Sequence, residues 1–168
     1  LSTIHRNDNT DYADKLTSIF QSFIEIGNTF KIPIILPLHP RTSKMMNALL
    51  SEELNNEIEQ NEFIRIIPPT SFLNIIALEK NCRLVITDSG GVQKEAYFFK
   101  KPCVILRPQT EWVEIVETGN AIITDADRGN IISAVGKFLG KDALSFPPIF
   151  GNGKSAEFIV NQIVNELN

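Results

Sequence analysis

The stretch with the clearest chemical potential runs from Leu84 to Ala96 and reads LVITDSGGVQKEA. It predicts a buried strand, a tight turn of small residues and the first turns of a helix. In the turn, Ser89, Gly90 and Gly91 let the backbone approach a ligand closely, because two of the three have no Cβ. The helix points unpaired N–H groups and the positive end of its dipole at the same spot. The turn therefore favours an anion such as a phosphate, and a glycine-containing turn with nothing bound is the alternative.

The elements that position this turn alternate along the chain. Apolar runs that predict strands cover residues 1–4, 32–38, 63–67, 84–87, 103–106 and 121–124. Predicted helices cover residues 11–26, 43–59, 71–80, 91–99, 111–117 and 125–139, and a last amphipathic helix covers residues 154–167. This alternation predicts an α/β fold, a Rossmann-like three-layer α/β/α arrangement around a six-stranded parallel sheet.

Glycine, proline and serine mark several predicted boundaries. Gly27 is placed to end the first helix, and Ser43 to cap the second. Pro33 and Pro37 cannot donate ladder hydrogen bonds, so we expect them near the ends of the second strand or at an edge. Residues 5–9 are expected to form a polar turn, and residues 140–153 the longest irregular segment.

Polar residues follow most of the predicted strands. Ligands of parallel α/β sheets bind beyond the carboxyl ends of the strands. The loops at those ends hold His5 and Arg6, His39 to Arg41, Pro69 and Thr70, the Ser89 turn, Arg107, and Asp125. We expect these loops to open on one edge of the sheet, where together they fit a shared anionic ligand better than any one loop. For His39 and Arg41, packing or helix capping is an equally good interpretation.

The composition limits the function classes. With 168 residues, 43% of them hydrophobic, 21% charged, and a net charge of −4, the chain fits one globular domain. It carries no basic field for nucleic acid or an anionic membrane, and no apolar run approaches the ~18 residues of a membrane span. Cys82 and Cys103 are interpreted as buried free thiols, which fits a reducing, cytoplasmic compartment. The chain begins inside an extended segment without a Met, which we interpret as one domain of a longer protein.

Several motifs resemble one enzyme family, the non-hydrolysing UDP-N-acetylglucosamine 2-epimerases. They are TDSGGVQKEA at 87–96, Lys101-Pro102, Arg107, and TEWVE at 110–114. The residues TIHR at 3–6 followed by Asn9 are similar to the family's Thr-x-His-Arg-x-Glu-Asn motif, and GNGKS at 151–155 is similar to its late Gly-Asp-Gly-x-Ala/Ser turn. The resemblance implies that residues 1–168 are the C-terminal, UDP-binding domain of a GT-B-type two-domain fold. The N-terminal domain, with the proposed acid/base carboxylates, would then be missing from this chain.

The resemblance also implies a chemistry and a set of site residues. Family members epimerise C2 of a UDP sugar by eliminating UDP to give a glycal and adding it back to the other face. Neither step needs a redox cofactor or a metal, and the full-length enzymes commonly form homodimers. Ser89, Gly90 and Gly91 match the diphosphate-binding turn, Glu95 matches the acid that holds the ribose hydroxyls, and His5 matches the catalytic histidine of the cleft. A solvated helix residue for Glu95 and a hydrogen-bonded turn residue for His5 are the alternatives.

The chain departs from the common family pattern at several positions. Asp8 replaces a common Glu, and Thr70 and Ile75 replace a Gln and a Phe near the uracil. Trp112 replaces an Arg that helps to bind the nucleotide; either Arg107 compensates, or Trp112 marks a subgroup. The sequence QTEWVE at 109–114 resembles that of family members that act on UDP-2,3-diacetamido-glucuronate. The resemblance thus implies UDP-N-acetylglucosamine or this modified sugar as the substrate. A GT-B glycosyltransferase domain and a non-catalytic nucleotide-sugar sensor are the alternative classes of function.

Overall fold

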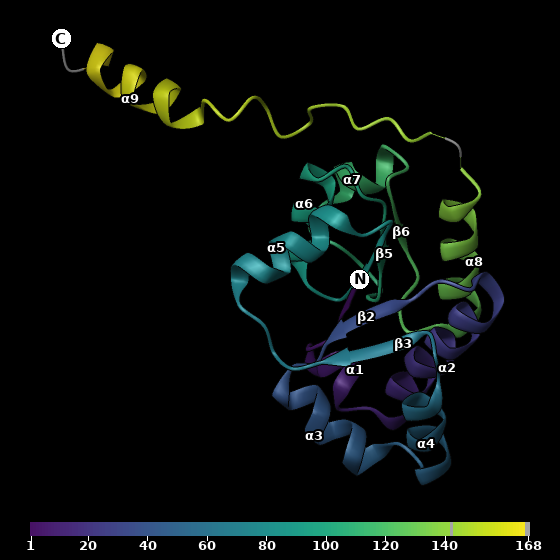
Figure 1. Ribbon diagram of the computed structural model, residues 1–168. Coiled ribbons are helices and arrows are strands. Elements are labelled where there is room, and N and C mark those ends of the chain that lie inside the picture. Colours follow the sequence, from purple (N-terminus) through teal and green to yellow (C-terminus); the bar gives the residue numbers. More distant parts are fainter. Residues whose placement is uncertain (142, 167–168) are drawn as a thin grey trace.

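A computed structural model describes residues 1–141 and 143–166 of the chain (Figure 1). The strands are β1 (Ser2–Thr3), β2 (Ile34–Pro37), β3 (Ile64–Ile67), β4 (Val85–Thr87), β5 (Cys103–Ile105) and β6 (Ala121–Ile123). The helices are α1 (Asn7–Thr10), α2 (Ala13–Phe30), α3 (Pro40–Leu49), α4 (Glu52–Gln60), α5 (Phe72–Asn81), α6 (Gly90–Phe98), α7 (Val113–Glu117), α8 (Arg128–Leu139) and α9 (Ser155–Glu166). The six predicted strands all form, and every ladder between them is parallel.

The strands form a four-stranded sheet in the order β1-β4-β5-β6 and a separate pair, β2-β3, instead of the single six-stranded sheet expected. The reason lies in the prolines of β2. Ile34 and Leu38 donate their N–H groups toward β3, so the alternating residues 33, 35 and 37 face the side of β1. Two of these three are Pro33 and Pro37, which have no N–H to donate. β1 and β2 therefore lie side by side without a ladder, and the prolines lie at an edge, as the sequence predicts.

Helices cover both faces of the strands, which confirms the three-layer α/β fold (Figure 1). Successive strand residues point to opposite faces. On one face Ile86 and Val104 join the core beneath α2 and α8. On the other face Val85 and Ile105 pack with residues of α6 and α7. The carboxyl ends of β1 and β4 are thereby fixed side by side, in the register Thr3 to Thr87.

Two helix boundaries differ from the predictions. α2 continues past Gly27 to Phe30, and Lys31 ends it in the left-handed conformation at φ 55°. Gly27 serves packing instead, because a Cβ there would lie 2.6 Å from the Cβ of Phe63. The predicted second helix is split into α3 and α4, since Ser51 caps a new helix and accepts a hydrogen bond from the N–H of Leu54 at 3.2 Å.

The segments that follow β1 and β2 also differ from the predictions. Residues 7–9 of the expected polar turn belong to the short helix α1, which ends at Thr10. α3 begins at Pro40, with His39 as its N-cap, so Ser43 lies inside the helix and does not cap it. His39 Nδ1 accepts a hydrogen bond from the N–H of Arg41 at 3.2 Å, which confirms the capping interpretation for this histidine.

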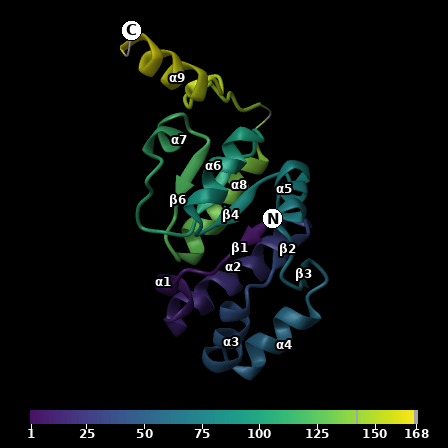
Figure 2. The same cartoon turned by 90° about the vertical axis from the view of Figure 1, so that its left-hand side faces the viewer.

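The C-terminal helix α9 lies apart from the rest of the described chain (Figure 2). The segment of residues 140–153 before it is irregular, as expected; residue 142 lies outside the described residues. α9 also forms as predicted, and its apolar side chains remain exposed, with Phe158 at 65% and Ile159 at 55%. Leu167, which the sequence places on the same side, lies outside the described residues. Within residues 1–141 and 143–166, none of the helices has the length and apolarity needed to cross a membrane.

The two cysteines are free thiols. Cys103 is fully buried, as predicted, whereas Cys82 at the end of α5 is half-buried. Burial raises the pKa of both thiols, so they stay protonated and unreactive near neutral pH.

Candidate functional site

The glycine turn has the geometry that the sequence predicts. Ser89 is the N-cap of α6, and its Oγ accepts a hydrogen bond from the N–H of Val92 at 3.5 Å. The N–H of Ser89 is itself held by Thr87 Oγ1 at 2.9 Å. Gly90 and Gly91 are the first two residues of the helix, so their N–H groups have no intrahelical acceptor. The turn thus combines free donors with the positive end of the helix dipole, which together suit a phosphate.

Asp88 joins this turn to the loop after β1. The side chain is 0% exposed, and its Oδ2 accepts hydrogen bonds from the N–H groups of His5 (3.1 Å) and Arg6 (3.0 Å) and from Asn9 Nδ2 (3.2 Å). Its Oδ1 lies 3.4 Å from Nδ1 of the His5 ring. The His5 side chain is 41% exposed, so the ring is held on one side and open on the other. A role for Asp88 was not predicted from the sequence, although an acid directly before the glycine turn was a usable signal.

A pocket of about 200 Å³ opens beside the turn. It collects the carboxyl ends of β1, β2 and β3 and the start of α6, and its lining includes Thr3, Ile4, His5, Pro37, His39, Pro69, Thr70, Ile75 and Val92. Three predicted site residues, His5, Thr70 and Ile75, are therefore brought together. The rings of His5 and His39 lie 5.9 Å apart across this space, so His39 both caps α3 and lines the pocket.

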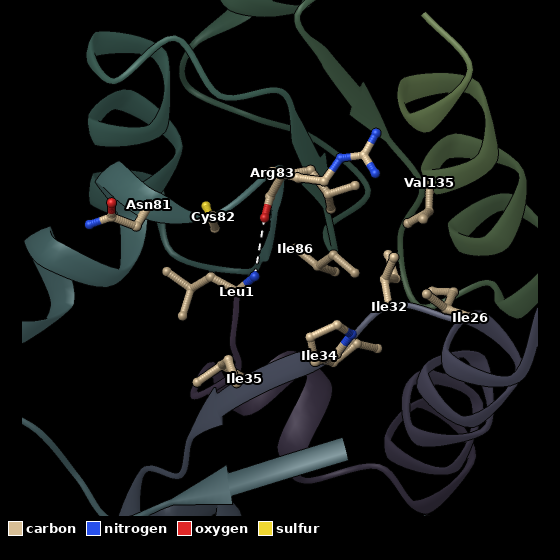
Figure 3. Close-up of a pocket in the computed structure, with 12 residues that line it drawn as sticks. Leu1, Ile26, Ile32, Ile34, Ile35, Asn81, Cys82, Arg83, Ile86 and Val135 are labelled. Atoms are coloured by element: carbon tan, nitrogen blue, oxygen red, sulfur yellow. Dashed lines mark hydrogen bonds between the residues drawn. The ribbon is translucent and has the colours of Figure 1, made fainter. Parts of the chain in front are cut away.

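A second, larger cavity of about 300 Å³ lies at the opposite ends of the strands (Figure 3). Its walls are mainly apolar and include Ile32, Ile34, Leu84 and Ile86. In its lining, the backbone nitrogen of Leu1 donates a hydrogen bond to the carbonyl of Leu84 at 3.1 Å. None of the predicted site residues is in its lining, and the amino ends of parallel strands are not where such sheets bind ligands. The smaller pocket is therefore the candidate site.

Arg107 lies against the glycine turn but is already paired. Its Nη1 and Nη2 each donate to a carboxylate oxygen of Glu111 at 2.8 Å. These hydrogen bonds hold the pKa of Glu111 down at about 2. A Cβ added to Gly90 would lie 3.2 Å from Glu111 Oε2 and 3.8 Å from Arg107 Nη1. The structure therefore places Arg107 at the turn, and adds Glu111, which the sequence analysis did not single out for the site.

Trp112 contacts the backbone of the glycine turn. Its Nε1 donates to the carbonyl of Gly90 at 2.7 Å. Its ring lies beneath Lys94, with Nζ 4.3 Å from the ring centroid, and meets Phe150 edge-on. At the position where the resemblance expects an arginine, this chain thus has a side chain that fixes the backbone of the turn.

Glu95 lies further along α6 and is half-buried. It is three residues beyond Val92, which lines the pocket, so the two side chains share a helix face. Its carboxyl lies within hydrogen-bonding reach of Glu79 on α5. Burial, together with the charge of Glu95, raises the pKa of Glu79 to about 8. Glu79 was not predicted from the sequence, because an acid in a helix ordinarily predicts a solvated position.

The remaining strand-end residues are paired away from the pocket. Arg41 makes a charged hydrogen bond to Asp11 at 2.6 Å, and Asp125 lies 3.3 Å from Lys15 Nζ. Neither residue appears in the pocket lining. Across the described part of the chain, no three His, Cys, Asp or Glu side chains come together as a metal site.

The sequence of the chain is similar to that of one family of enzymes. Residues 1–164 match the family model for UDP-N-acetylglucosamine 2-epimerase. A UDP-N-acetylglucosamine 2-epimerase of Methanococcus maripaludis is 40% identical over 166 residues, which are 99% of this chain and 44% of that protein. A UDP-2,3-diacetamido-2,3-dideoxy-D-glucuronate 2-epimerase of Pseudomonas aeruginosa is 40% identical over 163 residues, 97% of this chain and 43% of that protein.

Solved structures agree. The crystal structure of Methanocaldococcus jannaschii UDP-GlcNAc 2-epimerase in complex with UDP-GlcNAc and UDP superposes with a TM-score of 0.84 at 39% identity. The match covers 98% of this chain and 44% of that one. The chain thus spans less than half the length of the relatives that it matches.

Proposed function

Because this chain belongs to the UDP-N-acetylglucosamine 2-epimerase family, we propose that it is the UDP-binding half of a UDP-sugar 2-epimerase. Residues 1–168 would be the C-terminal domain, and an N-terminal domain would complete the cleft; the match to 44% of a relative's length supports this division. The observation that carries the proposal is the link through Asp88, which holds the loop of His5 against the glycine turn of Ser89.

In this proposal the parts of UDP meet different side chains. The N–H groups of Gly90 and Gly91, with Ser89, bind the diphosphate. Arg107 lies beside them and would donate to the diphosphate in place of its present partner, Glu111. Glu95 accepts hydrogen bonds from the ribose hydroxyls, since an ionised carboxylate is an acceptor and ribose offers two donors. The uracil lies against Thr70 and Ile75, which line the same pocket as His5.

His5 is the proposed catalytic residue of this half. Its Nδ1 faces Asp88, and that contact fixes the orientation of the ring. Nε2 is then the nitrogen available to the ligand. In the doubly protonated imidazole, an Nε2–H group would donate to the diphosphate and assist its departure from the sugar.

The reaction proposed for the two-domain protein follows the family chemistry. The proton at C2 is removed and the bond between C1 and UDP breaks, which gives a glycal. UDP then adds back while C2 is protonated on the other face, so the configuration at C2 is inverted. The acid/base carboxylates belong to the N-terminal domain, so this chain alone should bind UDP weakly and turn over no substrate. No redox cofactor or metal takes part in the proposed steps.

Two substrates fit the proposal, UDP-N-acetylglucosamine and UDP-2,3-diacetamido-glucuronate, because epimerases named for each are 40% identical to this chain. Incubation of the two-domain protein with each sugar in D₂O, followed by NMR, would separate them. We expect the 2-epimer and deuterium at C2 with one of the two. Transfer of the sugar to an acceptor, or release of free sugar without epimer, would instead point to a glycosyltransferase or a hydrolase.

The protein in its complete form is proposed to be a cytoplasmic homodimer. The two free thiols, one of them fully buried, fit a reducing compartment. The exposed apolar residues Phe158 and Ile159 of α9 offer a surface for the N-terminal domain of the same chain. Light scattering of the two-domain protein would measure its oligomeric state.

A further inference from the structure

Glu79 is a buried acid that the proposed mechanism does not yet use. The residue is 0% exposed on α5. Within the described chain, neither of its carboxyl oxygens has a hydrogen-bond donor. An ionised carboxylate that is buried without a hydrogen-bond donor loses its hydration, and no protein contact replaces it. Ionisation of Glu79 is therefore unfavourable in free energy. The group within hydrogen-bonding reach is another carboxyl, that of Glu95.

The pair lies directly behind the pocket. Ile75 of α5 and Val92 of α6 both line the pocket. Glu79 follows Ile75 by four residues, and Glu95 follows Val92 by three, so each acid shares a helix face with a pocket residue. The two helices pack against each other. The contact between the acids therefore continues the wall of the pocket by one helical turn.

Two carboxyl groups in contact are favourable only if they share a proton, because two negative charges at that distance repel. The fully buried member is the one that keeps the proton, since burial penalises its charged form more strongly. One carboxyl then becomes an O–H donor and the other remains a pure acceptor.

We propose that Glu79, in its protonated form, is a positioning residue that donates its O–H to Glu95 and holds that carboxylate in place for the ribose hydroxyls of UDP. The inference rests on the proposed function and adds to it a proton that must be present for tight binding. One oxygen of Glu95 accepts from Glu79, and the other remains available to the ribose.

Two cysteine thiols and one lysine lie in the same region. Cys82 at the end of α5 and Cys103 on β5 lie close enough to interact with Glu79. Burial keeps both thiols protonated, so they add no charge near neutral pH. Lys101 acts on Cys82. A change of charge in this region between pH 7 and 9 is therefore assigned first to Glu79, whose pKa is raised to about 8 by burial and by the charge of Glu95.

The test measures UDP affinity against pH for the chain and for the Glu79→Gln variant. Glutamine keeps a donor of similar shape but cannot ionise. We expect the parent chain to lose about tenfold in UDP affinity between pH 7 and pH 9, because ionised Glu79 repels Glu95 and no longer donates to it. We expect Glu79→Gln to change by less than about twofold over the same range. Glu59→Gln, an exposed acid on α4, is the matched control and should follow the parent.

A second measurement does not depend on UDP. The ¹³C carboxyl resonances of glutamate-labelled protein should include one that titrates near pH 8 and is missing in Glu79→Gln. Equal pH profiles of UDP affinity for the parent and Glu79→Gln would overturn the inference and leave the proposed function standing. Absence of UDP binding by the parent at pH 7 would overturn the proposed function and, with it, the role of Glu79.

Discussion

Replacement of Asp88 with alanine should loosen the connection between the glycine turn and the loop of His5. The carboxylate is fully buried and accepts the N–H groups of His5 and Arg6 and the amide of Asn9, at 3.0 to 3.2 Å. Hydrogen bonds to a charged group contribute about 1.5–3 kcal/mol each, and they are not additive. Three donors left without an acceptor should therefore lower the free energy of unfolding by on the order of 4 kcal/mol. Asp88→Asn keeps an oxygen for these donors, so it should cost only ~1–2 kcal/mol.

Urea unfolding followed by circular dichroism measures these differences, provided that the slopes of the transitions agree. Glu59→Ala, which removes an exposed acid from α4, is the control and should change the unfolding free energy by less than ~0.5 kcal/mol. Where Asp88→Ala remains folded, UDP affinity should also fall, because His5 is no longer held beside the turn. A loss below ~1 kcal/mol for Asp88→Ala would refute the reasoning, since the network would then not hold the two loops together.

Three further predictions concern other parts of the chain. The folded chain holds the proton of Glu79 up to about pH 8 while the unfolded chain releases it near 4.5, so stability should fall by up to ~1.4 kcal/mol per pH unit in that window. Glu79→Leu should flatten this fall in thermal unfolding between pH 5 and 9 and raise the stability at pH 8.5; identical slopes in both proteins would contradict it. Gly27→Ala should destabilise the chain by ~1–3 kcal/mol in urea unfolding, although alanine favours helix, because its Cβ would lie 2.6 Å from that of Phe63. A gain in stability would show that α2 and the turn before β3 can move apart. Gly91→Ala meets only Ser89 Oγ, at 3.9 Å, so unfolding should be unchanged while calorimetry records weaker UDP binding; full affinity would mean that the diphosphate does not approach Gly91.

Much of the fold follows from local pattern. Strand positions and the cap at Ser89 could be predicted, because apolar runs, small residues and a βα turn are features of neighbouring residues. The division of the sheet could not be predicted from the prolines alone, since it depends on which side of β2 faces β1. Gly27 was misinterpreted for a similar reason, because its role comes from Phe63, a residue far along the chain.

The candidate site also contains residues that could be predicted from the sequence and residues that could not. The turn at Ser89 and the loop of His5 were predicted from their own residues and from the family resemblance. Asp88 and Glu79 were missed because their roles come from burial and from distant partners, His5 and Glu95. Trp112 was recognised as a departure, but its hydrogen bond to the carbonyl of Gly90 requires the folded turn.

The most direct test of the account is calorimetric titration of this chain with UDP at pH 7, alongside Glu95→Ala and the exposed control Glu59→Ala. We expect the parent chain and the control to bind one UDP with equal affinity, and Glu95→Ala to lose ~1–3 kcal/mol of binding free energy through the lost ribose hydrogen bonds. Equal affinity for all three proteins would remove Glu95 from the site. No binding by the parent chain would contradict the assignment of the glycine turn to UDP.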